Sequence, residues 1–377
     1  MAGSRAGVRK MTPTDLLARF NGPQTFGNGR AFWAAAGLVL GLAVLYPLIA
    51  DSFNVANTAY FGVWTFMALG LSVIWGYGGL LSFGQTAFFG LAGYAYGVIA
   101  INLGDAHGYP ILALLAALTI ASAFALILGY FMIYGGIGGV FVGIVTLSVT
   151  LAFATFMNQT AGPQWHIGRA RLNGYNGMTR IPSLAIVDFA GNKLKIDGPA
   201  FYYLILALMV IVYLGLRVLL NSRFGNVLVA IRENPERTEL LGYDIRRYQL
   251  GAFVIGGFLA GLSGALYAAW GNFIVPASMA LPAAAMPIIW VAVGGRQDLT
   301  ATLIGTLVVL YVFQALTVIS QEYALVVIGA VLLVTILFAP GGYVIGIANL
   351  LRGGRRGLIG MRTGPVDARL GAETTNE

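Results

Sequence analysis

The residue types that perform catalysis are sparse in this chain of 377 residues, and none is placed for it. The two histidines, His107 and His166, have no second ligand at metal-binding spacing, and there is no cysteine to serve as a thiolate ligand or nucleophile. No glycine is followed by lysine, so the phosphate-binding loop of ATPases is absent, and so is the Gly-x-Gly-x-x-Gly dinucleotide motif. We therefore expect no catalytic residue, no metal and no cofactor in this chain.

Polar but uncharged side chains inside apolar stretches are the stronger candidates for function. Seven of them could line a path for a polar solute: Ser82, Gln85, Thr86, Thr146, Ser148, Thr150 and Gln314. The structural alternative is that each hydroxyl bonds its own helix and that the nearby Gly-x-x-x-Gly pairs mark close helix packing. Gln85 is the hardest to explain in that way, because its amide needs several partners in a dry site.

A second candidate is the polar segment 217–249, which lies between two apolar stretches. Asn226–Glu233 has the apolar spacing of a short amphipathic helix. A second short helix is predicted after it, with Asn234 as N-cap, Pro235 in the first position and Gly242 at the end. The segment is either an ordinary loop on the membrane surface or a rigid docking element for a cytoplasmic partner.

Composition identifies the environment of these candidates as a membrane. The chain is 58% hydrophobic and 10% charged, with a mean hydropathy of +0.81, whereas soluble domains carry about 25% charged residues. We predict that all 22 Lys and Arg and all 14 Asp and Glu lie in tails and connections. A charge at mid-membrane costs about 2.5–3.5 kcal/mol and usually marks an ion relay. Transport by this chain would therefore need energy from elsewhere.

The elements that hold these residues are predicted to be an all-α bundle of about ten membrane helices, with no soluble domain. The predicted spans are Ala31–Ala50, Ala59–Trp75, Gln85–Leu103, Ile111–Tyr134, Gly139–Met157, Phe201–Leu216, Leu250–Trp270, Leu281–Val293, Thr302–Ser320 and Tyr323–Phe338. The membrane domain is residues 31–340. The flanking tails are 1–30, with an interfacial helix starting at Thr12-Pro13, and 341–377.

The distribution of basic residues predicts the orientation of the bundle. If both termini are cytoplasmic, 17 of the 22 Lys and Arg lie on the cytoplasmic side, and the other five share the external loop 158–200. Within that loop, Ala185–Phe189 and Leu194–Ile196 are predicted to form a β-hairpin. Segment 217–249 is then cytoplasmic. The surplus charge of +8 follows the membrane rule, so we expect no nucleic-acid partner.

Three sequence stretches resemble the branched-chain amino-acid ABC transporter permeases of the LivM type and their urea-permease relatives. They are Trp75–Gln85 (WGYGGLLSFGQ), Gly225–Asn234 (GNVLVAIREN) and Ala260–Tyr267 (AGLSGALY). The resemblance covers about Ala59 to Gly342. It departs from the family at Leu281–Pro287 and at Arg296-Gln297-Asp298. These departures leave the solute open among branched-chain or other amino acids, urea and short amides.

The resemblance implies a multi-pass subunit of an importer in the bacterial inner membrane, in contact with membrane lipids. Its implied partners are a second homologous permease, two cytoplasmic ATPases that hold ATP and Mg²⁺, and a periplasmic solute-binding protein. It also implies that the residues pressed against an ATPase are Arg223, Ala230, Arg232, Glu233, Asn234, Pro235 and Glu236. A channel or facilitator that works alone is the alternative of another class, and it would need no docking helix.

Overall fold

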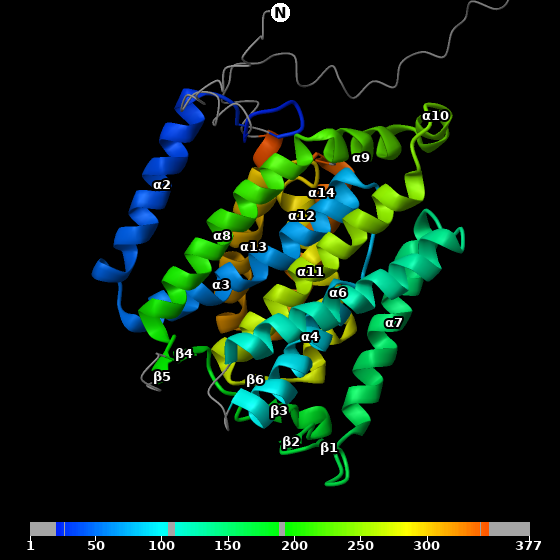
Figure 1. The fold of residues 1–377 in the computed structure, drawn as a ribbon. Coiled ribbons are helices and arrows are strands. Elements are labelled where there is room, and N and C mark those ends of the chain that lie inside the picture. Colours follow the sequence, from blue (N-terminus) through cyan, green and yellow to red (C-terminus); the bar gives the residue numbers. More distant parts are fainter. Residues whose placement is uncertain (1–19, 26, 105–109, 188–192, 340, 347–377) are drawn as a thin grey trace, which may run out of the picture.

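A computed structural model describes residues 20–25, 27–104, 110–187, 193–339 and 341–346. The predicted interfacial helix at Thr12-Pro13 and most of the C-terminal tail lie outside the described residues. The described part is a helical bundle, so the all-α prediction is confirmed (Figure 1).

Every predicted apolar segment forms a helix. The apolar helices of the described residues are α2 (Arg30–Ile49), α3 (Ser52–Leu71), α4 (Gln85–Ile99), α6 (Pro110–Tyr134), α7 (Val140–Gln159), α8 (Gly198–Leu220), α11 (Ile245–Gly271), α12 (Leu281–Gly294), α13 (Leu299–Ile319) and α14 (Gln321–Phe338). Two π-helical turns, η1 (Ser72–Tyr77) and η2 (Ala100–Gly104), extend α3 and α4. Eight of the ten are long and apolar enough to cross a membrane, whereas α12 and α14 are shorter. The number of actual crossings stays a prediction.

Helix α11 lies at the centre of the bundle, packed against α3, α4 and α6. Its glycines allow this approach: a Cβ at Gly264 would collide with the Phe89 carbonyl of α4, and one at Gly261 would lie 2.7 Å from Cβ of Ala121 on α6. Small residues at such contacts let membrane helices pack closely. The packing interpretation of the glycine pattern is therefore correct for α11.

The two ends of the bundle are built differently (Figure 1). One end carries the short helices α9 (Arg223–Glu233) and α10 (Pro235–Leu240). The other end carries short strands, among them the predicted hairpin of β4 (Ala185–Val187) and β5 (Lys193–Lys195), which is confirmed.

Further elements at that end were not predicted. They are the strands β1 (His166–Ile167), β2 (Ala170–Arg171), β3 (Met178–Thr179) and β6 (Phe273–Ile274), and the 3₁₀ turns η3 (Gly174–Asn176) and η4 (Pro276–Met279). Strand β1 pairs with β2, and β3 pairs with β6 across almost a hundred residues of sequence, a contact that no local pattern signals.

Helix α2 stands at the edge of the bundle, and none of its residues, all of which are described, is buried. Pro47 lies inside this helix and has no N–H to donate to the Ala43 carbonyl. The hydroxyl of Tyr202 on α8 donates to that carbonyl at 2.7 Å, and Tyr203 donates to Val44 at 3.0 Å. These two bonds tie the far end of α2 to the bundle.

The prediction that charged residues avoid the apolar helices is wrong at Arg217. Helix α8 continues past the predicted end at Leu216, and the Arg217 side chain within it is fully buried. The reason is that residues 20–25 and 27–29, which we name the N-terminal strap, wrap the guanidinium. The carbonyls of Phe20 and Gly27 both accept hydrogen bonds from it. A buried charge is tolerated when its donors are satisfied in this way.

Candidate functional site

The loop that precedes α4 is held by α7. The Thr146 hydroxyl accepts a hydrogen bond from the Phe83 amide at 3.0 Å and donates to the Val142 carbonyl at 2.7 Å. Thr150 donates to the carbonyls of Thr146 and Phe83 at 2.8 and 3.2 Å. The hydroxyl of Ser82 accepts from the Gly84 amide at 3.1 Å. Three of the seven predicted path residues thus hold the loop in place.

Gln85 and Thr86, which directly follow this loop in the chain, differ from these three residues in their hydrogen bonding. They are the first residues of α4 and each is 1% exposed. Neither amide atom of Gln85 and no atom of the Thr86 hydroxyl has a hydrogen-bond partner within the described residues. An unpaired buried polar group costs about 1–3 kcal/mol. Such groups in the interior of a permease are candidates for contact with a solute or with buried water.

Ser148 and Gln314 do not join this group. Ser148 is exposed on α7 and donates to its own Ile144 carbonyl at 2.9 Å, as the structural alternative predicted. Gln314 on α13 exchanges hydrogen bonds of 2.8 and 3.2 Å with the Asn57 amide on α3. The seven residues predicted as one path therefore lie in three places, and five of them gather where α4 meets α7.

An aromatic cluster that the sequence did not reveal lies one helical turn beyond Gln85. The ring of Phe89 stacks on Trp64 of α3 with centroids 4.9 Å apart, and Trp290 of α12 lies 5.7 Å from Trp64. The buried indole N–H of Trp290 has no acceptor in the described part of the chain. Apolar rings with a few unpaired polar atoms are the usual lining of sites for small amphipathic ligands. No sequence signal links these residues, since they come from three helices.

Helices α9 and α10 confirm the prediction of two short helices. The Ser222 hydroxyl caps α9 by accepting from the Phe224 amide at 3.2 Å. The Asn234 side chain caps α10 by accepting from the Arg237 amide at 2.9 Å. Gly242 ends the pair with a φ of 87°, a conformation that favours glycine.

Most of the predicted docking residues point away from the bundle. Val227, Leu228 and Ile231 are buried and fix α9 against the membrane helices. The side chains left exposed are those of Arg223, Ala230, Glu233, Asn234, Pro235 and Glu236. The remaining predicted residue, Arg232, is half-buried and points inward.

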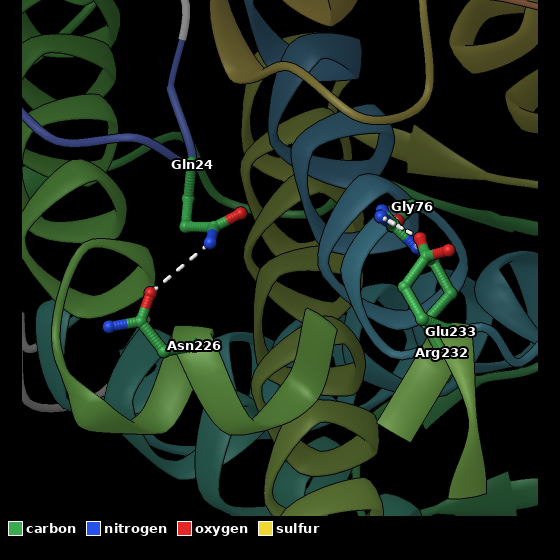
Figure 2. A network of polar contacts seen from close by, with 5 residues as sticks. All are labelled: Gln24, Gly76, Asn226, Arg232 and Glu233. Carbon is green, nitrogen blue, oxygen red and sulfur yellow. Dashed lines mark hydrogen bonds and ion pairs between the residues drawn. The ribbon is translucent and has the colours of Figure 1, made fainter. Parts of the chain in front are cut away.

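Arg232 joins α9 to the end of α3 (Figure 2). Its guanidinium donates to the Gly76 carbonyl in η1 at 2.6 Å and forms an ion pair with Glu233, also at 2.6 Å. A Cβ at Gly79 would lie only 3.2 Å from the Arg232 side chain. The last turn of α9 is thus fixed to the π-helical turn that continues into the Ser82–Gln85 loop.

The connection between α12 and α13 reaches the same turn. The Arg296 carbonyl accepts a hydrogen bond from Ser72 at 3.0 Å, and its guanidinium lies 5.2 Å above the Trp75 ring. Burial, and then the positive charge of Arg232, lower the pKa of the Arg296 guanidinium. Asp298, another residue that departs from the family pattern, caps α13 by accepting from the Ala301 amide at 2.8 Å.

A bundle of apolar helices, with a capped pair of amphipathic helices on one face and unpaired polar groups inside, defines a multi-pass membrane transport subunit. The model of the family described as branched-chain amino acid transport system / permease component matches residues 54–336. The chain belongs to this family.

The similar curated proteins agree with that assignment. The high-affinity branched-chain amino acid transport system permease protein LivM of Escherichia coli is 26% identical over 81% of this chain and 73% of its own length. A probable LivM of Methanocaldococcus jannaschii is 24% identical over 76% of this chain and 91% of its own. The nucleoside ABC transporter permease NupC of Lactococcus lactis is 30% identical over 29% of this chain and 34% of its own. No solved structure gives a significant match.

Proposed function

We propose that this chain forms, with a second related permease, the membrane path of an ABC importer for amino acids, branched-chain amino acids first. The observation that carries the proposal is the family match over residues 54–336, which includes all of the helices from α4 to α13. The names of the LivM relatives refer to branched-chain amino acid transport, and these proteins match over most of this chain. The nucleoside permease matches over less than a third of it and weighs less.

The two ends of the bundle suggest where the partners bind. Two cytoplasmic ATPases, which hold ATP and Mg²⁺, would press on the exposed face of α9 and α10, and this end would lie on the cytoplasmic side of the bacterial inner membrane. An external solute-binding protein would meet the opposite end, which is built of short strands and loops. The basic residues around α9 and α10 favour this orientation.

The contacts of Arg232 offer a mechanism for coupling. A displacement of α9 acts on the Gly76 carbonyl through a short charge-assisted hydrogen bond. From Gly76 the chain continues directly through the loop that Thr146 holds and into α4 at Gln85. Movement at the ATPase face would therefore reach the unpaired polar groups of Gln85 and Thr86. These groups would contact the solute as it passes.

The test is uptake by the complete complex in proteoliposomes with radiolabelled leucine, isoleucine or valine. We expect ATP-dependent uptake that unlabelled branched-chain amino acids inhibit and that urea, acetamide and nucleosides do not. Inhibition by urea, acetamide or a nucleoside alone would refute the amino-acid assignment. The chain purified without partners should neither hydrolyse ATP nor admit solute. Passive entry through the chain alone would identify a channel instead.

A further inference from the structure

The N-terminal strap contacts three elements at the face that carries α9. Thr25 in the strap is buried, and its hydroxyl accepts a hydrogen bond from Asn221 at the end of α8 at 3.0 Å. The Gln24 carbonyl accepts from the buried hydroxyl of Tyr77, the last residue of η1, at 2.9 Å. The Gln24 side chain donates to Asn226 in the first turn of α9 at 3.2 Å (Figure 2). One strap residue therefore bridges η1 and α9.

Arg217 holds the strap in this position. Its guanidinium bonds the Phe20 carbonyl at 2.9 Å, the Gly27 carbonyl at 3.4 Å and the Asn28 side chain at 3.3 Å. It also lies 5.1 Å from the centres of the Phe32 and Trp33 rings at the start of α2. Both ends of the strap are thus fastened to one buried charge. The strap conformation depends on that charge, because it is strap atoms that satisfy most of its donors.

With the strap in place, α9 is attached to η1 at both ends. Its last turn is attached directly, through Arg232 and the Gly76 carbonyl. Its first turn is attached indirectly, through Asn226, Gln24 and the Tyr77 hydroxyl. A helix that is bonded to η1 at one end only can rotate about that contact, whereas a helix bonded at both ends displaces η1 when it moves. The buried face of α9 and Arg232 already hold this helix against the bundle, and the strap adds a polar link from its first turn to η1.

We propose that the N-terminal strap is a brace that transmits displacement of the first turn of α9 to η1, with Gln24 and Tyr77 as positioning residues. The proposal rests on the function proposed above, in which ATPases act on α9. The strap acts as a brace for coupling, because its bonds to Tyr77 and Asn221 join it to η1 and to the end of α8 and not to the predicted docking residues of α9 and α10.

The experiment compares Gln24→Leu, Tyr77→Phe and the double variant in the complete complex. Gln24→Leu removes the bond to Asn226, and Tyr77→Phe removes the bond to the Gln24 carbonyl, each with little change in volume. We expect the amount of solute imported per ATP hydrolysed to fall at least about twofold in each single variant, the factor that one net hydrogen bond corresponds to. The double variant should fall about as far as the single variants, because the two bonds lie in series in one link. ATPase rate and ATPase co-purification should stay at the wild-type level. Tyr130→Phe, at an exposed tyrosine within α6, is the matched control.

A pair swap separates coupling from simple support. Gln24→Asn together with Asn226→Gln keeps the summed length of the two side chains, so it should restore import per ATP, while Gln24→Asn alone should not. An unchanged ratio in Gln24→Leu and Tyr77→Phe would refute the brace. So would a parallel loss of uptake, ATPase rate and docking, which indicates a structural role only.

A measurement on the strap that does not depend on transport tests the brace separately from the proposed function. The chain has no cysteine, so a nitroxide on Pro23→Cys reports on the strap alone in this subunit. We expect a restricted nitroxide in the otherwise unchanged chain and a mobile one after Gln24→Leu. Equal mobility in both would overturn the brace, whichever solute the wild-type complex carries. Absence of amino-acid uptake by the wild type, with the mobility difference present, would overturn only the assignment of the solute.

Discussion

Replacing Arg217 by methionine should release the N-terminal strap while leaving the membrane helices folded. Methionine is close to arginine in volume and is compatible with the nearby rings of Phe32 and Trp33, but it is shorter and donates no hydrogen bond. Two of the bonds it removes join the charge to the strap, at 2.9 Å to the Phe20 carbonyl and at 3.3 Å to the Asn28 side chain. Bonds to a charged group contribute about 1.5–3 kcal/mol each. Part of this gain is offset by the desolvation of the charge, which methionine avoids.

A net loss of at least about 2 kcal/mol remains, and it raises the population of the open strap about 30-fold. Thr25, which is 4% exposed, is the position to probe. We expect a cysteine at Thr25 to react with a maleimide at least about 30-fold faster in the Arg217→Met background than in the otherwise unchanged chain. The measurement is the labelling rate of the purified complex in nanodiscs at fixed pH.

Two controls keep this prediction specific. Arg223→Met removes an exposed arginine a short distance along the chain and should leave the labelling rate at Thr25 unchanged. Arg217→Lys keeps the charge but lacks the planar fork of five donors, so its rate should be intermediate. An increase below about threefold in Arg217→Met would refute the argument that the buried charge holds the strap.

Three further predictions follow from the same contacts. A cysteine at Gln249 should be labelled from the cytoplasmic side and one at Asn176 from outside, since 17 of the 22 basic residues lie on the side assigned to Gln249. Glu233→Lys combined with Glu236→Lys should prevent co-purification of the ATPases without affecting membrane insertion, because like charges at an interface cost several kcal/mol. Gln85→Leu should raise the thermal unfolding temperature, since it removes an unpaired buried amide that costs about 1–3 kcal/mol, and should lower uptake more than tenfold.

A specific result would refute each of these three predictions. Labelling of Asn176 only from the cytoplasm would invert the topology. Glu322→Lys, at an exposed glutamate outside α9 and α10, controls for the change in charge. If the double variant still co-purifies with the ATPases as well as this control does, α9 and α10 are an ordinary surface loop. A Gln85→Leu variant that unfolds earlier and transports normally would show that the amide has a structural partner.

The sequence predicted the secondary structure because the signals for it are local. Hydropathy located all ten apolar helices to within a few residues at most ends. The caps at Asn234 and Gly242 and the two strands of the β4–β5 hairpin were predicted from residues only a few positions apart. Each of these features depends on residues that are close together in the sequence, so one short stretch is enough to specify it.

The candidate path was predicted less well because hydrogen-bond satisfaction is a property of the surroundings. Thr146 and Gln85 look alike in the sequence as polar residues in apolar stretches. In the fold, Thr146 bonds the loop before α4, whereas Gln85 has no partner within the described residues. The indole of Trp290 is a buried donor of the same kind, and nothing in its own segment distinguishes it.

What the sequence alone determined about this protein is its class: a bundle of apolar helices with a capped pair of short helices, in a family of amino-acid permeases. What only the tertiary structure decided is how these parts are connected. Arg232 meets Gly76 across 156 residues, and Gln24 meets Asn226 across 202. Arg217 is buried because the distant strap folds over it. Such contacts arise from the packing of separate helices, and local residue patterns carry no information about which distant atoms will meet.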